Sequence, residues 1–192
     1  EVKALRKNTT TLPDMNVKTL ADKKNIIKSK DNAFELEMDI TPNITGITGI
    51  ELYNAKGENV KIYFDTKEKK LVMDRTESGL IEFGNLSVPH DIEKNYSDVH
   101  QGAGNTPFRV FNSVNYKNDF ALGTWAPLSL CKGKTYHVDI FVDKCSVEIF
   151  VDGGRIAMTN LVFPTTPYTS IKFYNKGTSA SFHNIKISEL SL

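Results

Sequence analysis

Three carboxylates alternate along one short segment near the start of the chain. Glu35, Glu37 and Asp39 occupy every second position of the sequence FELEMDI, which spans residues 34–40. In an extended strand these side chains project from one face, about 6.5–7 Å apart for each two-residue step. Cleavage of a glycosidic bond requires a pair of carboxylates, so this strand is the sharpest catalytic candidate. The alternative is a solvated strand face whose charges discourage aggregation, and we favour this alternative.

A second set of residues has the side-chain types that hold sugars. Sugar sites combine an aromatic ring, which packs on the C–H side of the sugar, with carboxylates and arginines that hydrogen-bond its hydroxyl groups. The candidates are Asp74, Arg75, Glu148, Phe150 and Arg155. Two alternatives stay open for them: Asp74 and Arg75 form a structural ion pair in a turn, and Glu148 is a buried carboxylate bonded to neighbouring strands.

Other kinds of chemistry are poorly represented. The four histidines are scattered and no paired Cys/His spacing occurs, so we expect no metal site. No G-x-S-x-G motif is present. The sequence HQGAG at residues 100–104 has no strand-then-helix context, so we interpret it as a surface loop and not a phosphate cradle. We therefore expect no cofactor.

The two cysteines and the single tryptophan are expected to be structural. Cys145 shares the apolar register of Val147 and Ile149, which predicts a buried free thiol. A disulfide between Cys131 and Cys145 is the open alternative. Trp125 is interpreted as a core residue, with an interface or a sugar platform as the other possibilities.

The most informative segment for the fold spans residues 134–164. Apolar and polar residues alternate over residues 136–142 and again over 145–152, the pattern of two half-buried strands. Gly153 and Gly154 predict a two-residue hairpin turn, after which a third strand begins at Arg155. In this register Asp152 faces Arg155, so we predict an ion pair between them. Five side chains are predicted to lie in the core: Val138, Ile140, Val147, Ile149 and Val151.

Similar signals recur about every ten residues along the rest of the chain. Strands are predicted at residues 33–40, 47–53, 59–65, 69–75, 108–111, 120–125, 170–175 and 180–190. We find no convincing helical period. Many short strands separated by Gly, Asn, Asp and Pro predict an all-β fold, an antiparallel two-sheet β-sandwich of the concanavalin-like jelly-roll type. Residues 1–30 are interpreted as a linker with one or two short strands, and residues 31–192 as the sandwich domain.

Composition narrows the classes of partner. The formal net charge is +1, so nothing in the charge balance suggests a nucleic-acid partner. No run of residues has the length and hydropathy of a membrane-spanning helix, and the N-terminal sequence EVKALRKN lacks the apolar stretch of a signal peptide. If the protein is exported, its signal lies outside this chain.

Four separated sequences carry a family resemblance. They are VDKCSVEIFVDGG with a later VFP, KKLVMDRTESG at residues 69–79, APLSL at residues 126–130, and a closing segment that ends in FHNIKISEL. In this order they resemble the C-terminal β-sandwich of glycoside hydrolase family 32, a family of levanases, inulinases and invertases. The resemblance spans roughly residues 33–192.

The resemblance implies that the catalytic residues lie elsewhere. Family members carry them on a five-bladed propeller with the motifs W-M-N-D-P-N-G, R-D-P and E-C, none of which occurs here. The chain is also too short to add a propeller, whose blades need roughly 40–50 residues each. We therefore expect the partner of this module to be an N-terminal propeller domain that precedes Glu1, and we expect the chain alone to be inactive.

Three functions are compatible with this sequence. The first is a non-catalytic module of a fructan- or sucrose-cleaving enzyme, extracellular or periplasmic, which supports the propeller and binds fructosides through the five candidates above. The second is an independent glycan-binding module, because some relatives of this sandwich bind fructan on their own. The third is a sandwich-fold glycosidase that uses Glu35, Glu37 or Asp39. Its E-x-E-x-D order departs from the E-x-D-x-x-E order of such enzymes, which makes it the weakest of the three.

Overall fold

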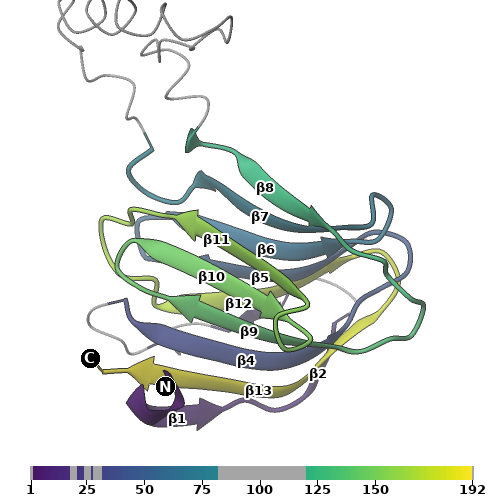
Figure 1. The fold of residues 1–192 in the computed structure, drawn as a ribbon, viewed down its shortest axis with the longest axis horizontal. Coiled ribbons are helices and arrows are strands. Elements are labelled where there is room, and N and C mark those ends of the chain that lie inside the picture. The colour runs from purple at the N-terminus through teal and green to yellow at the C-terminus, as the bar shows by residue number, and fades with distance from the viewer. Residues whose placement is uncertain (1, 18–20, 24–26, 28–31, 82–119, 192) are drawn as a thin grey trace, which may run out of the picture.

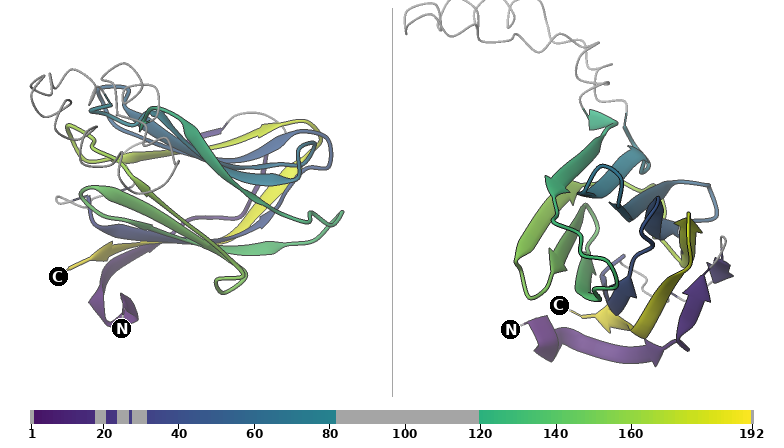
Figure 2. Two further views of the ribbon diagram at one scale, coloured as in Figure 1. Left: turned by 45° about the horizontal axis from the view of Figure 1, so that its top comes forward. Right: turned by 90° about the vertical axis from the view of Figure 1, so that its right-hand side faces the viewer.

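The computed structural model describes residues 2–17, 21–23, 27, 32–81 and 120–191. Its strands form two antiparallel sheets that pack face to face, as Figure 1 and Figure 2 show. The predicted all-β sandwich is therefore confirmed. Among the described residues no helix is long and apolar enough to cross a membrane.

We name the two layers sheet A and sheet B. The strands of sheet A, in spatial order, are β1 (Arg6–Thr11), β13 (Ala180–Leu190), β4 (Phe34–Thr41), β9 (Tyr136–Val142), β10 (Ser146–Val151) and β11 (Ile156–Leu161), with β2 (Met15–Val17) also paired to β13. The strands of sheet B are β3 (Ala21–Lys23), β12 (Ser170–Lys176), β5 (Ile47–Tyr53), β6 (Asn59–Asp65), β7 (Lys70–Glu77) and β8 (Gly123–Pro127).

The core lies between the sheets and follows the alternation of the sequence. Strand β9 buries every second residue, and β10 repeats this pattern in antiparallel register. Because successive side chains of a strand point to opposite faces, one set fills the core and the other faces outward. The five predicted core residues are all buried: Val138, Ile140, Val147, Ile149 and Val151.

The N-terminal segment joins both layers of the sandwich. A 3-10 turn, η1 (Val2–Leu5), leads into β1, which pairs with β13. Strand β2 also pairs with β13, while β3 pairs with β12 of sheet B. Both chain ends lie on the side of sheet A (Figure 2). The division between a linker at residues 1–30 and a domain at 31–192 stays a prediction.

Side-chain bonds connect the two sheets where β11 and β8 lie close together. The Arg75 guanidinium of β7 donates to the carbonyl oxygen of Leu161 on β11, at 3.0 Å. The Asn160 amide donates to the Thr124 hydroxyl on β8, at 2.6 Å. These bonds join the two sheets along the side of the sandwich formed by β8 and β11.

The turns of the hairpin segment differ from the sequence-based prediction. The connection from β10 to β11 has four residues, 152–155, because the last strand pair is Val151 with Ile156. Asp152 has a φ of 50° and its carboxylate binds Lys134 at 2.6 Å, so among the described residues its ion pair is with Lys134 and not with Arg155. Cys145 is exposed, not buried, because it lies in the turn closed by the bond from the Asp143 amide to the Ser146 carbonyl.

Other predicted features shift or fall outside the described residues. The strand expected at residues 120–125 begins only at Gly123. Trp125 is 57% exposed and not a core residue, since β8 is the edge strand of sheet B and the ring points outward. Both cysteines are free thiols in the structure. The predicted strand at 108–111 and the loop at 100–104 lie outside the described residues.

Replacement of Ile149 tests the core. Its side chain is fully buried between the sheets. Removal of its methyl and methylene groups leaves a cavity, so we expect Ile149→Ala to lower the free energy of unfolding by about 2–5 kcal/mol. Urea titration followed by circular dichroism measures the change. Thr159→Ala, at an exposed position of β11, serves as the control and should change stability by less than about 0.5 kcal/mol. Equal effects of the two substitutions would contradict this assignment of the core.

Candidate functional site

The acidic residues of β4 lie on the outer face of sheet A, between the neighbouring strands β13 and β9. Glu37 lies opposite Lys186 of β13 on one side and Asp139 of β9 on the other. Asp39 lies opposite His183 and His137 in the same two strands. The alternation of FELEMDI thus places all three carboxylates on one face, as the sequence predicts.

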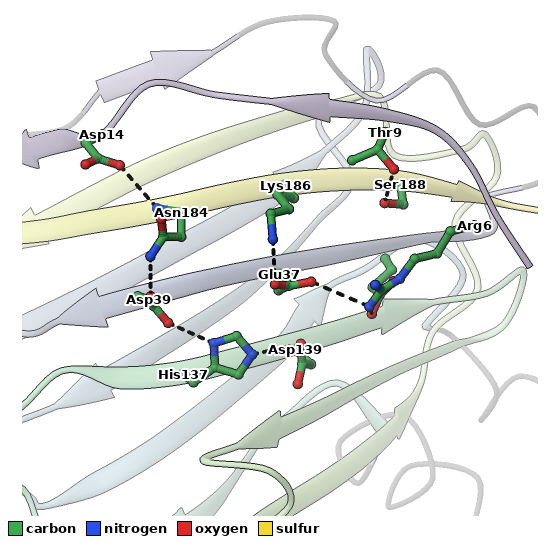
Figure 3. Close-up of polar contacts among 11 residues, drawn as sticks. Arg6, Thr9, Asp14, Glu37, Asp39, His137, Asp139, Asn184, Lys186 and Ser188 are labelled. Atoms are coloured by element: carbon green, nitrogen blue, oxygen red, sulfur yellow. Dashed lines mark hydrogen bonds and ion pairs between the residues drawn. The ribbon is translucent and has the colours of Figure 1, made fainter. Parts of the chain in front are cut away.

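Arg6 neutralises the first two carboxylates. Its guanidinium forms a two-bond ion pair with Glu35, in which Nη2 lies 2.5 Å from Oε1 and Nε bonds the other oxygen, and Nη2 lies 3.5 Å from Glu37. Only 2% of Glu35 is exposed, so its charge needs such a partner. The Glu35 carboxylate raises the pKa of Arg6, which stays protonated. Lys186 completes the arrangement at 3.0 Å from Glu37 (Figure 3).

Asp39 belongs to a second group of bonds on the same face. Figure 3 shows its carboxylate between the Asn184 amide, at 2.7 Å, and His137 Nδ1, at 2.8 Å. Burial works in the opposite direction, but the two hydrogen bonds outweigh it and lower the pKa of Asp39. The hydrogen bond with Asp39 is also the main reason why the pKa of His137 is raised.

Asp139 of β9 completes this surface. His137 Nε2 lies 3.4 Å from its carboxylate, and burial raises the pKa of Asp139. Oxygens of Glu35, Glu37 and Asp139 lie within 4.8 Å of one another, close enough to share a cation. The cation in contact with two of them is the Arg6 guanidinium. The arrangement therefore has the chemistry of a strand-to-strand ionic network, in which none of the β4 carboxylates is left as a nucleophile or acid without a partner.

The structure separates the five predicted sugar-binding residues. Asp74 and Arg75 lie on β7 of sheet B, whereas Glu148 and Phe150 lie on β10 of sheet A and Arg155 lies in the turn at its end. The Asp74 carboxylate accepts bonds from the Thr76 amide and hydroxyl, at 3.0 and 2.8 Å. Asp74 and Arg75 therefore have different partners.

Arg75 has a role in the architecture. Besides its bond to Leu161, its guanidinium carbon lies 4.2 Å from the centre of the Phe120 ring. Burial lowers the pKa of Arg75, and its Nε has no hydrogen-bond partner within the described part of the chain. The Arg75 side chain therefore connects β7 to β11.

Glu148 and Phe150 line a pocket of about 560 Å³ on the outer face of sheet A. Phe141 lines it as well, and its ring meets the Phe150 ring edge-on, with 5.9 Å between ring centres. Apart from these three, the pocket is lined by Leu5, Ala33, Asp139, Val142, Asp143, Ser146, Gly153, Gly154 and Leu190. Within the described residues the Glu148 carboxylate has no hydrogen-bond or ion-pair partner.

Sequence reasoning missed three contributors to this surface. Asp139 and Phe141 could have been found from the hairpin register, because Glu148 pairs with Phe141 and Phe150 pairs with Asp139. Arg6 carries no such signal, since its segment shows no apolar alternation and its partner Glu35 is 29 residues away.

The His137–Asp39 pair predicts a pH-dependent stability. The folded-state pKa of His137 is raised. The stability that the protonated histidine contributes is therefore fully present below its unfolded pKa of about 6.5, and it is lost as the pH rises through the folded-state pKa. Because 44% of the His137 side chain is exposed, we expect His137→Gln to cost about 1 kcal/mol or less at pH 5.5 and less still at pH 8.5. Urea titrations at the two pH values measure this.

Asp39→Asn provides the control for this pair. In the Asp39→Asn background the cost of His137→Gln should depend less on pH, because the carboxylate that contributes most to the raised pKa of the histidine is gone and Asp139 and Glu37 remain. An unchanged pH dependence would show that another group is responsible.

Comparisons with known proteins agree with the resemblance in the sequence. The model of the family described as "Glycosyl hydrolases family 32 C terminal" matches residues 1–189. A levanbiose-producing levanase of Bacillus subtilis (strain 168) is 35% identical over 95 residues, which are 50% of this chain and 17% of the relative. A levanase of Bacillus sp. (strain L7) is 23% identical over 170 residues, 86% of this chain and 15% of the relative.

A solved structure supports the fold. The fructosyltransferase from A. japonicus superposes with a TM-score of 0.69 and 17% identity, over 99% of this chain and 27% of that one. This chain therefore spans less than a third of that protein and less than a fifth of the two levanases. Because the family model spans nearly the whole sequence, the chain belongs to glycoside hydrolase family 32 as its C-terminal domain.

Proposed function

We propose that this chain is a non-catalytic β-sandwich module of a fructan- or sucrose-cleaving hydrolase, in which it supports a catalytic propeller. The observation that carries the proposal is the family match over residues 1–189. The network on sheet A agrees with it, because each outward carboxylate of β4 already has an ion-pair or hydrogen-bond partner on another strand. Glycoside cleavage needs one carboxylate free to attack or activate water and another that can donate a proton.

The proposed location of the parent protein is extracellular or periplasmic. The matched relatives include levanases. A polymeric fructan is too large to enter a cell passively, so an enzyme that cleaves it must act outside the cytoplasm. A W-M-N-D-P-N-G motif upstream in the same reading frame would support the enzyme module over an independent glycan-binding module.

We further propose a weak fructoside site centred on Glu148 and Phe150, with Arg155 at its end. The support is that Glu148 has no partner within the described residues and lies beside an aromatic pair in a pocket. A carboxylate can accept bonds from adjacent hydroxyl groups of the sugar while the ring packs on its C–H face. Asp74 and Arg75, which the sequence predicts for the same site, lie in the other sheet and can contribute only separately.

The first test concerns catalysis. The isolated chain should release no reducing sugar from levan, inulin or sucrose, because the carboxylates of β4 are engaged in ion pairs and hydrogen bonds. A reducing-sugar assay with a fructan hydrolase as the positive control measures this. Turnover that is lost in Glu35→Gln or Glu37→Gln, but kept in Glu68→Gln at an exposed turn, would overturn the non-catalytic assignment.

The second test concerns the pocket. Titration calorimetry with short levan oligosaccharides should give a dissociation constant in the micromolar-to-millimolar range, since the site offers few contacts. Glu148→Gln should weaken binding by about tenfold, the loss expected for one charge-assisted hydrogen bond. Glu68→Gln is the matched control. Absence of heat with the wild type, or equal binding by Glu148→Gln, would leave the module with a supporting role only.

A further inference from the structure

The outer face of sheet B carries a row of aromatic side chains that crosses five strands. In the strand register Tyr174 of β12 pairs with Gly49 of β5, and Gly49 pairs with Tyr63 of β6. Tyr63 in turn pairs with Val72 of β7, and Val72 pairs with Trp125 of β8. We call Tyr174, Tyr63 and Trp125 the aromatic row.

The alternation of burial shows that the row faces outward. On either side of Val72 in sequence, Leu71 and Met73 lie in the core, and Ile62 and Phe64 do so on either side of Tyr63. Neighbouring strands lie about 4.8 Å apart, so the row from β12 to β8 is roughly 19 Å long. It becomes more accessible toward the edge strand, from the buried Tyr174 through the half-buried Tyr63 to Trp125, which is 57% exposed.

Gly49 lets two of these rings approach each other. A Cβ atom at this position would overlap the Ile62 carbonyl oxygen and would lie 2.6 Å from Tyr63 Cβ, so only glycine fits. The Tyr63 and Tyr174 rings are tilted by 60° with 6.3 Å between their centres. One tilted aromatic pair therefore extends over a strand that has no side chain of its own there.

Charged side chains flank the row on both sides, one two-residue step away. On one side the register gives Lys172, Glu51, Lys61 and Asp74, and on the other side Lys176, Asp65 and Lys70. Lys172 lies 3.3 Å from Glu51, and the Lys70 ammonium lies 4.4 Å from the centre of the Trp125 ring. Because the signs alternate along each flank, the face presents no block of one charge.

We propose that this face binds a neutral polysaccharide chain that lies across the strands. One sugar ring stacks on Trp125 and the next lies near Tyr63, while Asp74 and Lys61 bond the hydroxyl groups that project beside the rings. This site is separate from the Glu148 pocket, which is on the outer face of the opposite sheet. It adds a polymer-holding function to the supporting role proposed above.

The dimensions of the face favour a glycan over other occupants. The apolar strip is one side chain wide, because charged rows run about 7 Å to either side of it. A stable protein interface needs about 800 Å² per partner with an apolar centre, and this strip is too narrow for that. A nucleic acid would meet Glu51, Asp74 and Asp65 along its backbone, and those carboxylates would repel its phosphates.

Trp125 reports directly on the proposed site because it is the only tryptophan of the chain. Addition of levan, inulin or a neutral glucan such as dextran should change the intensity and shift the wavelength of its emission in a saturable manner. Tyr63→Ala keeps this reporter and should raise the half-saturating concentration by about tenfold, while its urea midpoint shows whether it remains folded.

Affinity gel electrophoresis with the same polymers tests Trp125 itself. Trp125→Ala should lose most of the retardation by the gel and Trp125→Phe should keep part of it, while Leu161→Ala, which removes an exposed apolar side chain from β11, should migrate as the wild type does. With dextran, which is not a fructoside, Glu148→Gln should leave both the emission response and the retardation as in the wild type, and this result separates the site from the fructoside pocket.

Three outcomes would overturn the inference. The first is a failure of the sheet B face to bind, seen either as no emission change with any of the three polymers or as equal retardation of Trp125→Ala and the wild type. The second is loss of the emission response in Glu148→Gln, which would place the ligand on sheet A. The third is a dimer in analytical ultracentrifugation that Trp125→Ala dissociates, which would make a second copy of the chain the occupant.

Discussion

Strand β4 imposes the constraint on which the organisation of sheet A depends. It lies between β13 and β9, and its outward side chains include those of Glu35, Glu37 and Asp39. Because three like charges on adjacent steps of a strand repel each other, and burial of an unpaired charge is costly, cations and donors must reach them from the neighbouring strands. Lys186 and Asn184 do so from β13, and His137 from β9.

The same constraint explains why β1 belongs to the sandwich. Glu35 is the most buried of the three carboxylates, and its partner Arg6 comes from the edge strand beyond β13. The two-bond geometry suits a guanidinium and could not be reproduced by lysine. The segment around Arg6, which lacks apolar alternation, is thus fixed to the sheet by its strand pairing and by one buried ion pair. Its composition suggests a linker and gives no sign of that pair.

The alternation of apolar and polar residues predicts the core and most strands, and it also predicts which side chains share a face of a strand. It places Val138, Ile140 and Ile149 in the core, as observed. By the same rule Asp74 and Arg75 point to opposite faces of β7, which argues against an ion pair between them. The extra residue that β7 carries opposite β6 near Asn59 and Lys61 adds a bulge there, and bulges redirect side chains. Contacts such as Arg75 with Leu161 depend on how the sheets meet, which no local pattern encodes.

The two outer faces show how the same residue types lead to different chemistry. On sheet A, partners on β1, β13 and β9 satisfy the β4 carboxylates, and the network ends at Asp139. One step further along the sheet, Glu148 lies opposite Phe141 and Thr159, and neither of these side chains brings a positive charge to it. On sheet B, Lys172 pairs with Glu51 on one flank of the aromatic row, whereas Lys61 pairs with Glu77 and Lys70 pairs with Glu68. A polar group such as Glu148, which has no partner in the strand register, is therefore the better guide to function, because folding alone does not explain its presence.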